Sequence, residues 1–214
     1  MPEQRSYSLL TALVVLLAGV SGACASGGKP GNAAATAAST AELRSEVAEA
    51  RTVLQQLSAT LYETDQPETL NGGKWFKRFS KQHERVREAG QTLREGETQY
   101  AENRRLYLNR WEDDLSSILQ PELREASAKR RDVLRADLRR TGDGLEAMTQ
   151  DFEPLLRTLG DLEAFLVNDL TANAFVKARP QLTTAWENCN ALVEDSADVL
   201  DDLNGLVDEL KPVD

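Results

Sequence analysis

Residues 134–166 read "LRADLRRTGDGLEAMTQDFEPLLRTLGDLEAFL" and contain the longest regular apolar pattern in the chain. Successive positions of this pattern lie alternately four and three residues apart, which places them on one face of an α-helix. These positions are Leu134, Leu138, Thr141, Leu145, Met148, Phe152, Leu155, Leu159, Leu162 and Leu166. Because the pattern keeps its phase beyond Pro154, we expect a kink there and not a helix end.

Two further segments show the same alternation. The stripe of the first is formed by Leu43, Val47, Ala50, Leu54, Leu57 and Leu61. The stripe of the other is formed by Leu182, Trp186, Cys189, Val193, Ser196, Leu200, Leu203, Val207 and Leu210. Pro180 marks or bends the start of that last helix. Each pattern predicts an amphipathic helix.

The segment from Trp75 to Leu119 has a weaker pattern. One of its lines of residues has heptad spacing and consists of Phe79, Val86, Leu93, Tyr100 and Tyr107. The neighbouring line is partly polar and consists of His83, Gly90, Glu97, Arg104 and Trp111. Glu97 and Arg104 are either a polar layer that fixes the register of the helices or solvated edge positions. Close approach of another helix is one reason for Gly90 and Gly96.

Turn signals separate these four segments. Pro67 and two glycines follow the first, Gln120–Pro121 precedes the third, and residues 168–175 form a short turn before the fourth. Short turns make successive helices antiparallel neighbours. We therefore predict an all-α fold, an elongated up-down-up-down bundle of four long helices with antiparallel coiled-coil packing. The two middle helices, at ~45 residues each, would be about 65 to 70 Å long.

The beginning of the chain predicts export. Leu9–Val20 is apolar but shorter than the ~20 residues of a spanning helix, and small residues lead from it to Cys24. We expect residues 1–23 to be a signal peptide and Cys24 to carry a lipid. Ser21 stands where a lipoprotein signal usually has a large aliphatic residue, so cleavage after Ala25 without a lipid, or a retained helix, stays open.

Residues 24–40 are rich in Gly, Ala, Ser and Thr, so we expect a flexible tether followed by a bundle domain at residues 41–214. The expected location is the bacterial cell envelope, at the periplasmic face of a membrane as a lipoprotein. A soluble periplasmic or secreted protein is the alternative. The chain has two cysteines, and with Cys24 at the processing site no internal disulfide can form.

Charge is unevenly spread along the chain. A formal net charge of −10 disfavours nucleic acid as a partner. Residues 74–87 nevertheless hold six basic residues, namely Lys74, Lys77, Arg78, Lys81, Arg85 and Arg87. We expect this segment either to contact an anionic surface such as lipid headgroups or to be a solvated helix end. A second basic run at residues 129–140 should face the acidic residues of 181–214, since these segments are antiparallel.

No residue pattern indicates catalysis. His83 lacks the carboxylate and histidine partners of a metal site in a bundle, so we interpret it as a packing residue. Cys189 lies on an apolar stripe and should be buried. Trp75, Trp111 and Trp186 could form a binding patch, but two of them occupy seam positions, so we expect core anchors. We predict no catalytic, cofactor-binding or metal-binding residue, no cofactor and no small-molecule substrate.

Residues 110–170 also carry a family resemblance. They read "RWEDDLSSILQPELREASAKRRDVLRADLRRTGDGLEAMTQDFEPLLRTLGDLEAFLVNDL" and include a W-E-D stretch, a basic run and an E-P-L-L segment. This region resembles an uncharacterised bacterial family of small helical envelope proteins, a domain-of-unknown-function family of the 2959 type. The resemblance implies an envelope location and a helical rod, and it implies no catalytic residue. Ser21 and Pro180 depart from the family pattern.

These features together predict a structural or interaction module without catalytic activity, tethered in the envelope. Its expected partners are a membrane, through the lipid anchor, and an envelope protein or a second copy of the chain. The alternative is a membrane-surface binding protein that uses the basic residues 74–87.

Overall fold

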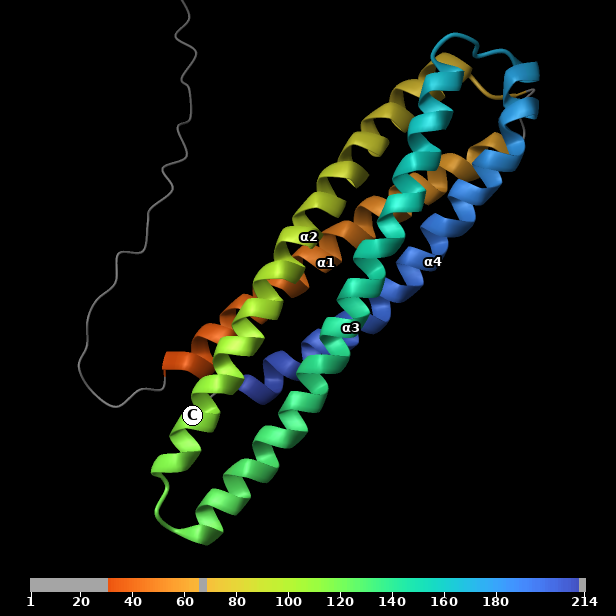
Figure 1. Ribbon diagram of the computed structural model, residues 1–214. Helices are drawn as coiled ribbons and strands as arrows, with labels where there is room; N and C mark the ends of the chain where they lie inside the picture. Colours follow the sequence, from red (N-terminus) through yellow and green to blue (C-terminus); the bar gives the residue numbers. More distant parts are fainter. Residues whose placement is uncertain (1–30, 66–68, 212–214) are drawn as a thin grey trace, which may run out of the picture.

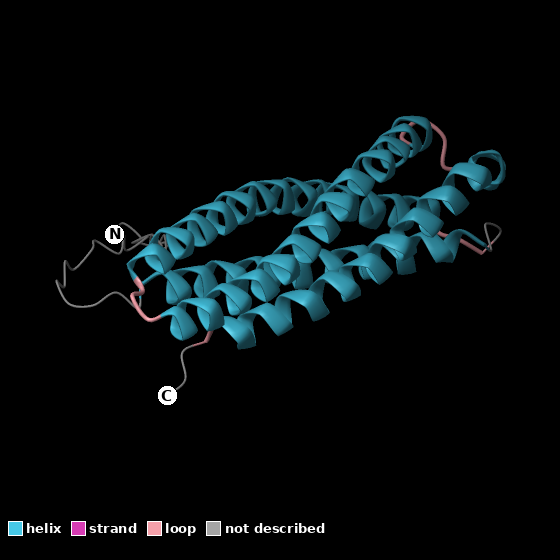
Figure 2. Ribbon diagram, turned by 60° about the horizontal axis from the view of Figure 1, so that its bottom comes forward, coloured by secondary structure: helices cyan, strands magenta, loops and turns pink. Residues whose placement is uncertain are grey.

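The computed structural model describes residues 31–65 and 69–211, and nearly all of these residues are helical. The helices are α1 (Gly31–Tyr62), α2 (Gly72–Ser117), α3 (Pro121–Leu166) and α4 (Ala172–Leu210), and a short 3-10 helix, Glu63–Asp65, follows α1. The described part of the chain contains no strand, and Figure 2 shows only helices joined by short loops. The all-α prediction is confirmed.

The four helices form an up-down-up-down bundle. α1 packs against α2 and α4, and α3 packs against the same two helices, so each helix has two neighbours of opposite direction (Figure 1). With 46 residues in α2, the bundle is roughly 70 Å long at 1.5 Å per residue. The predicted four-helix architecture is therefore confirmed.

The helices differ in length, and this makes the two ends of the bundle unlike. α1 has 32 residues and α4 has 39, whereas α2 and α3 have 46 each. α2 and α3 therefore project beyond the other two helices as a hairpin (Figure 1). We call residues 112–129 the hairpin tip. The opposite end, where α1 joins α2 and α3 joins α4, is called the turn end.

The predicted stripes of α1 and α3 are correct at every position. All of their residues are buried in one core that also includes Phe79, Val86, Leu93 and Tyr100 of α2. Tyr107, the last residue of the predicted α2 line, is only half-buried. α3 continues through Pro154 without interruption.

The predicted stripe of α4 is correct at six of its nine positions. Trp186, Val193 and Leu200 are half-buried. At these three positions the preceding residue is buried instead, namely Ala185, Leu192 or Val199. Leu206 is buried next to the predicted Val207. Because apolar residues of α4 occur in adjacent pairs, two neighbouring stripes follow the same alternation of four and three residues. Contact with both α1 and α3 buries the stripe that includes the small Ala185.

Two helices begin earlier than expected. α1 begins at Gly31 and not at residue 41, so residues 31–40 of the expected tether are helical. Alanine is the strongest helix former, and the Thr40 hydroxyl donates to the Thr36 carbonyl at 2.8 Å, which allows Thr40 to be buried. α4 begins at Ala172, capped by Thr171, so Pro180 lies inside the helix. The expected signal peptide, Cys24 and the rest of the tether lie outside the described residues.

Candidate functional site

The basic segment of residues 74–87 lies on the first turns of α2, at the turn end. Three of its six cations are engaged by carboxylates. Arg78 pairs with Glu63 across the α1–α2 junction. Arg85 donates to Glu49 at 3.2 Å and to Gln56 at 2.7 Å, both on α1. Arg87 pairs with Glu84 one turn before it.

The other three cations are Lys74, Lys77 and Lys81, here called the lysine stripe. All three are exposed, and none forms an ion pair with a described residue. Their spacing of three and four residues places them on one side of α2. The structure therefore reduces the six predicted contact residues to three that present free charge to solvent.

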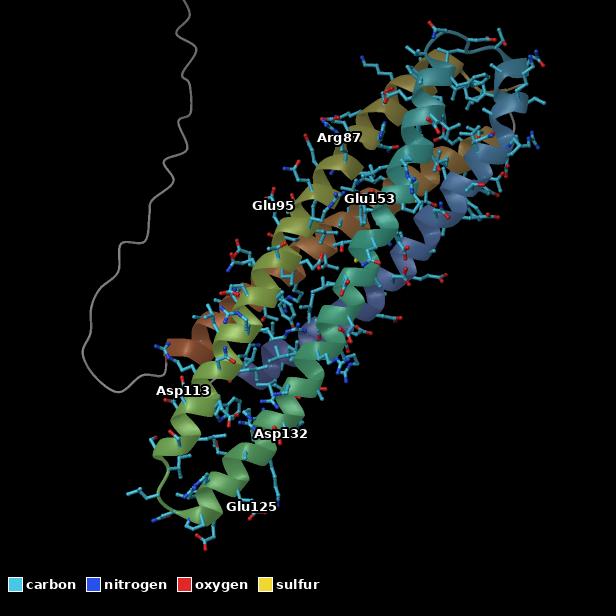
Figure 3. All side chains as sticks on the ribbon, in the orientation of Figure 1. Arg87, Glu95, Asp113, Glu125, Asp132 and Glu153 are labelled. Atoms are coloured by element: carbon cyan, nitrogen blue, oxygen red, sulfur yellow. The ribbon has the colours of Figure 1, made fainter. Side chains whose placement is uncertain are left out.

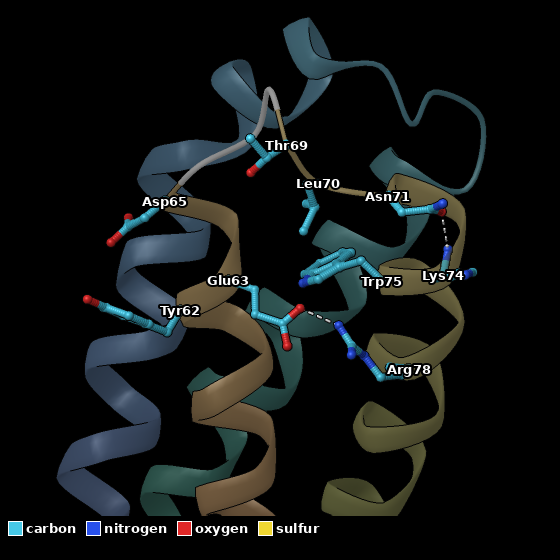
Figure 4. A pocket seen from close by; sticks show the side chains of 9 residues that line it. All are labelled: Tyr62, Glu63, Asp65, Thr69, Leu70, Asn71, Lys74, Trp75 and Arg78. Atoms are coloured by element: carbon cyan, nitrogen blue, oxygen red, sulfur yellow. Dashed lines mark hydrogen bonds and ion pairs between the residues drawn. The ribbon is translucent and has the colours of Figure 1, made fainter.

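A depression lies beside the lysine stripe, where α1 turns into α2 (Figure 4). It has a volume of about 580 Å³, and its lining includes Tyr62, Glu63, Asp65, Lys74 and Arg78. Trp75 also lines it, and the indole Nε1 of this residue donates to the Thr60 carbonyl at 2.8 Å. The depression mixes charged and aromatic groups.

Trp75 is a core residue that the periodicity did not assign. It is fully buried, its ring stacks on Phe79 with centroids 5.0 Å apart, and Phe175 meets it edge-on at 5.2 Å. Trp111 and Trp186, which were expected to be anchors, are only half-buried. Trp75 precedes Phe79 by four residues, and this spacing was the available signal.

Glu97 and Arg104 form a polar layer between α2 and α3. The Thr149 hydroxyl donates to Glu97 Oε2 at 2.8 Å. Arg104 Nη1 and the Tyr100 hydroxyl both donate to the Leu138 carbonyl, at 3.2 and 3.0 Å. Burial raises the pKa of Tyr100, so this hydroxyl keeps its proton. These bonds connect side chains to fixed positions on α3, which favours a role in register over a solvated edge.

His83 pairs with a carboxylate of α3. Its Nδ1 lies 2.8 Å from Glu163 Oε2. Burial raises the pKa of Glu163, but the neighbouring Ser80 and His83 side chains outweigh that effect, and the pKa lies below its ordinary value. Among the described residues, no group of three or more His, Cys, Asp and Glu side chains is arranged to hold a metal ion.

Cys189 is buried, as its place on the stripe predicts. The thiol donates to the Leu54 carbonyl at 3.0 Å, and burial raises the pKa of the thiol to about 12. It therefore remains protonated and unreactive near neutral pH.

Comparison with known proteins places the chain in a family. A family model described as "Protein of unknown function (DUF2959)" matches residues 32–210. The chain belongs to this family. The predicted family resemblance is thus confirmed, and the match begins one residue after the start of α1. No curated protein and no solved structure matches the chain.

The DUF2959 bundle also has an acidic groove that the sequence reasoning missed. It lies between α1 and α2, and two adjoining hollows of about 250 and 400 Å³ share Glu46 in their linings. Burial, together with the charges of Glu42 and Glu95, raises the pKa of Glu46. The groove joins residues more than 40 positions apart, so only the pairing of α1 with α2 brings them together.

The second basic run of the DUF2959 protein faces α4 in part. Arg140 pairs with Asp202 at 3.0 Å and Arg130 with Glu209 at 3.5 Å, as the antiparallel order predicts. The prediction is wrong for three other arginines, which pair with α2 or within α3 and are Arg131, Arg135 and Arg139. Within residues 31–65 and 69–211, no helix combines the length and apolar composition that a membrane crossing needs.

Proposed function

We propose that this DUF2959 protein is a structural or interaction module of the bacterial envelope, tethered through a lipid on Cys24 and without catalytic activity. The observation that carries this proposal is the distribution of exposed apolar side chains on an elongated bundle. Among the described residues, six of the eight large exposed ones lie at the two ends, and the other two lie on the sides of α2 and α3 before the hairpin tip. They are Tyr62, Phe165, Val167 and Val176 at the turn end, and Leu106, Leu119, Leu123 and Val133 toward the hairpin.

A rod with polar sides and apolar ends makes its contacts at the ends. Photo-crosslinking in intact cells tests this, with the crosslinking residue placed at Val176, at Leu119 or at the exposed Thr98 on the side of α2. We expect adducts from the two end positions and few from Thr98. Equal yields from all three positions would contradict the proposal.

The tether is tested separately by the intact mass of the mature protein. We expect Cys24 as the first residue, with an added diacylglycerol. A mature chain that begins at Ser26 without a lipid would refute the anchor and leave the soluble or secreted alternative.

The second candidate function is binding to an anionic membrane surface, and the lysine stripe favours it. Three unpaired cations on one side of a helix, at an end of the bundle that also exposes apolar residues, suit lipid headgroups. Co-sedimentation with liposomes of increasing anionic lipid content tests this function. The triple variant Lys74→Gln, Lys77→Gln, Lys81→Gln should lose binding. The matched control carries the same charge change at exposed residues of α3, as Arg124→Gln, Lys129→Gln and Arg139→Gln, and should bind like the wild type.

A further inference from the structure

The hairpin tip ends in exposed apolar side chains. Leu119 is 88% exposed and Leu123 is 58% exposed, and Ile118 lies between them and the bundle, half-buried. In the layer beneath, Leu115 is buried and the Trp111 indole donates to the Ser127 hydroxyl at 2.9 Å, although a hollow of about 230 Å³ remains between these residues. The tip therefore presents apolar residues at its end, above a layer that links α2 to α3.

The chain enters the bundle at this same end. Ala35 and Thr36 of α1 line a groove with residues 103–113 of α2, so Gly31 lies near the base of the hairpin tip (Figure 1). From Cys24 to Gly31 there are seven residue steps. Even a fully extended chain of that length spans at most about 25 Å. A lipid on Cys24 would hold the start of α1 within this distance of the bilayer.

The hairpin tip extends beyond the start of α1. From Trp111 to Leu119 the eight residues of helix and turn reach about 12 Å further at 1.5 Å per residue. Leu119 therefore lies on the side of the bundle where the tether leaves, well within the reach of that tether.

The charge of the hairpin tip selects the kind of lipid. The hairpin tip contains five acidic residues and two basic residues, Arg124 and Lys129, of which Lys129 pairs with Glu125. Glu112 pairs with Arg131. Asp113 and Glu125 lie on α2 and α3 close to the turn (Figure 3). Anionic headgroups would repel this end, so its contact with a bilayer is apolar and favours uncharged lipid. The lysine stripe at the turn end has the opposite preference.

We propose that Ile118, Leu119 and Leu123 insert into the interface of the membrane that carries the Cys24 lipid, with zwitterionic lipid as the partner. This inference rests on the lipid tether of the proposed function. The inserted hairpin tip would fix the orientation of the bundle relative to the bilayer. The lysine stripe, at the turn end, would then be directed away from this bilayer.

The test uses the purified, lipidated mature chain in phosphatidylcholine vesicles. The variant L119C carries an environment-sensitive fluorophore, and V176C, at an exposed apolar position of the turn end, is the matched control. Labelling is selective because the Cys24 thiol holds the lipid and Cys189 is buried. Spin-labelled lipids should quench the probe at position 119 several-fold more than the probe at 176. Adding phosphatidylglycerol should reduce that quenching, and so should a Leu123→Asp substitution.

Hydrogen–deuterium exchange of the unlabelled protein provides a readout without the fluorophore. Amides of residues 116–123 should exchange more slowly in vesicles than in detergent-free buffer. Equal quenching at 119 and 176, with unchanged exchange, overturns the inference while the anchor stands. The inference is also overturned if the probe at position 119 is shielded without vesicles and the protein has twice the expected mass. In that case a second copy of the chain covers the hairpin tip. A mature chain without a lipid refutes the tether and this inference together.

Discussion

Gly90→Ala should destabilise the bundle, although alanine is the better helix former. Gly90 is buried in α2, and a Cβ atom added there would lie 2.9 Å from Cδ1 of Phe152 on α3. Phe152 is fully buried in the core, so its ring cannot move without displacing neighbours. Overpacking of this kind costs about 1 to 3 kcal/mol. The gain in helix propensity is about 1 kcal/mol, which leaves a net loss of about 0 to 2 kcal/mol.

The control is Gly205→Ala on α4, where an added Cβ meets nothing within 4 Å. That variant keeps the propensity gain and should stabilise the protein by about 0.5 to 1 kcal/mol. Urea unfolding of both variants measures the difference in their free energies of unfolding. In a thermal melt, each kcal/mol of this difference corresponds to roughly 2 to 4 °C in Tm for a chain of this size. The expected order of stability is Gly205→Ala, wild type, Gly90→Ala.

A smaller partner should rescue the clash. Adding Phe152→Leu to Gly90→Ala should cost less than adding it to the wild type, so the two substitutions should couple by about 0.5 to 3 kcal/mol. If Gly90→Ala is as stable as Gly205→Ala, or if the coupling is zero, α2 and α3 do not approach closely at this point.

Three further predictions concern buried or half-buried groups. Leu145→Asp places a charge in the core of α3 and should cost several kcal/mol, about 3 or more, whereas Ala147→Asp at an exposed position should leave the melting temperature nearly unchanged. Glu46→Gln should stabilise the protein at pH 7, by at most about 1 kcal/mol at this partly exposed site. Because the pKa of Glu46 is raised in the folded state, its charged carboxylate destabilises the fold above that pKa. The gain in stability from Glu46→Gln should therefore vanish in thermal melts at pH 4. A gain that persists at pH 4 would exclude the charge as its cause. Native Cys189 should react with a thiol reagent far more slowly than the urea-unfolded protein, and equal rates would contradict its burial.

The α3 stripe was predictable because only one series of four- and three-residue steps in this helix is apolar. Val133, Leu156 and Phe165 each adjoin a stripe position, but the series that would run through them are mostly polar, and every predicted position is buried. In α4, by contrast, Leu192–Val193 and Val199–Leu200 are adjacent apolar pairs, and either member fits the alternation. Contacts with two neighbouring helices decide between them, and these contacts are not local in the sequence.

The candidate site was predictable in composition but not in pairing. Six cations in residues 74–87 are visible in the sequence. Their carboxylate partners Glu49 and Glu63 lie on or next to α1, so only the fold shows that Arg78 and Arg85 are engaged. The length of the tether was misjudged for a similar reason. Alanine and threonine suit a linker as well as a helix, and the burial of Thr36 and Thr40 against the bundle favours the helix.

The separation of the two ends leads to a last prediction about the lysine stripe. Gly31 and Tyr62 are joined by a helix of 32 residues, so the turn end lies about 48 Å from the start of α1 at 1.5 Å per residue. Charge is screened within about 8 to 10 Å at physiological salt. If the bundle stands upright on the proposed Cys24 tether, it would therefore present the stripe to a second surface and not to its own membrane.

Lipidated protein in zwitterionic vesicles should thus capture separate anionic vesicles, as measured by light scattering or by co-flotation of two dyes. Capture should fall with rising salt. It should disappear in the variant with Lys74, Lys77 and Lys81 changed to glutamine, and persist when Arg124, Lys129 and Arg139 are changed instead. The upright orientation is wrong if separate vesicles do not associate and, in a single vesicle population, anionic lipid increases binding that requires the lysine stripe. The bundle then lies flat on its own membrane.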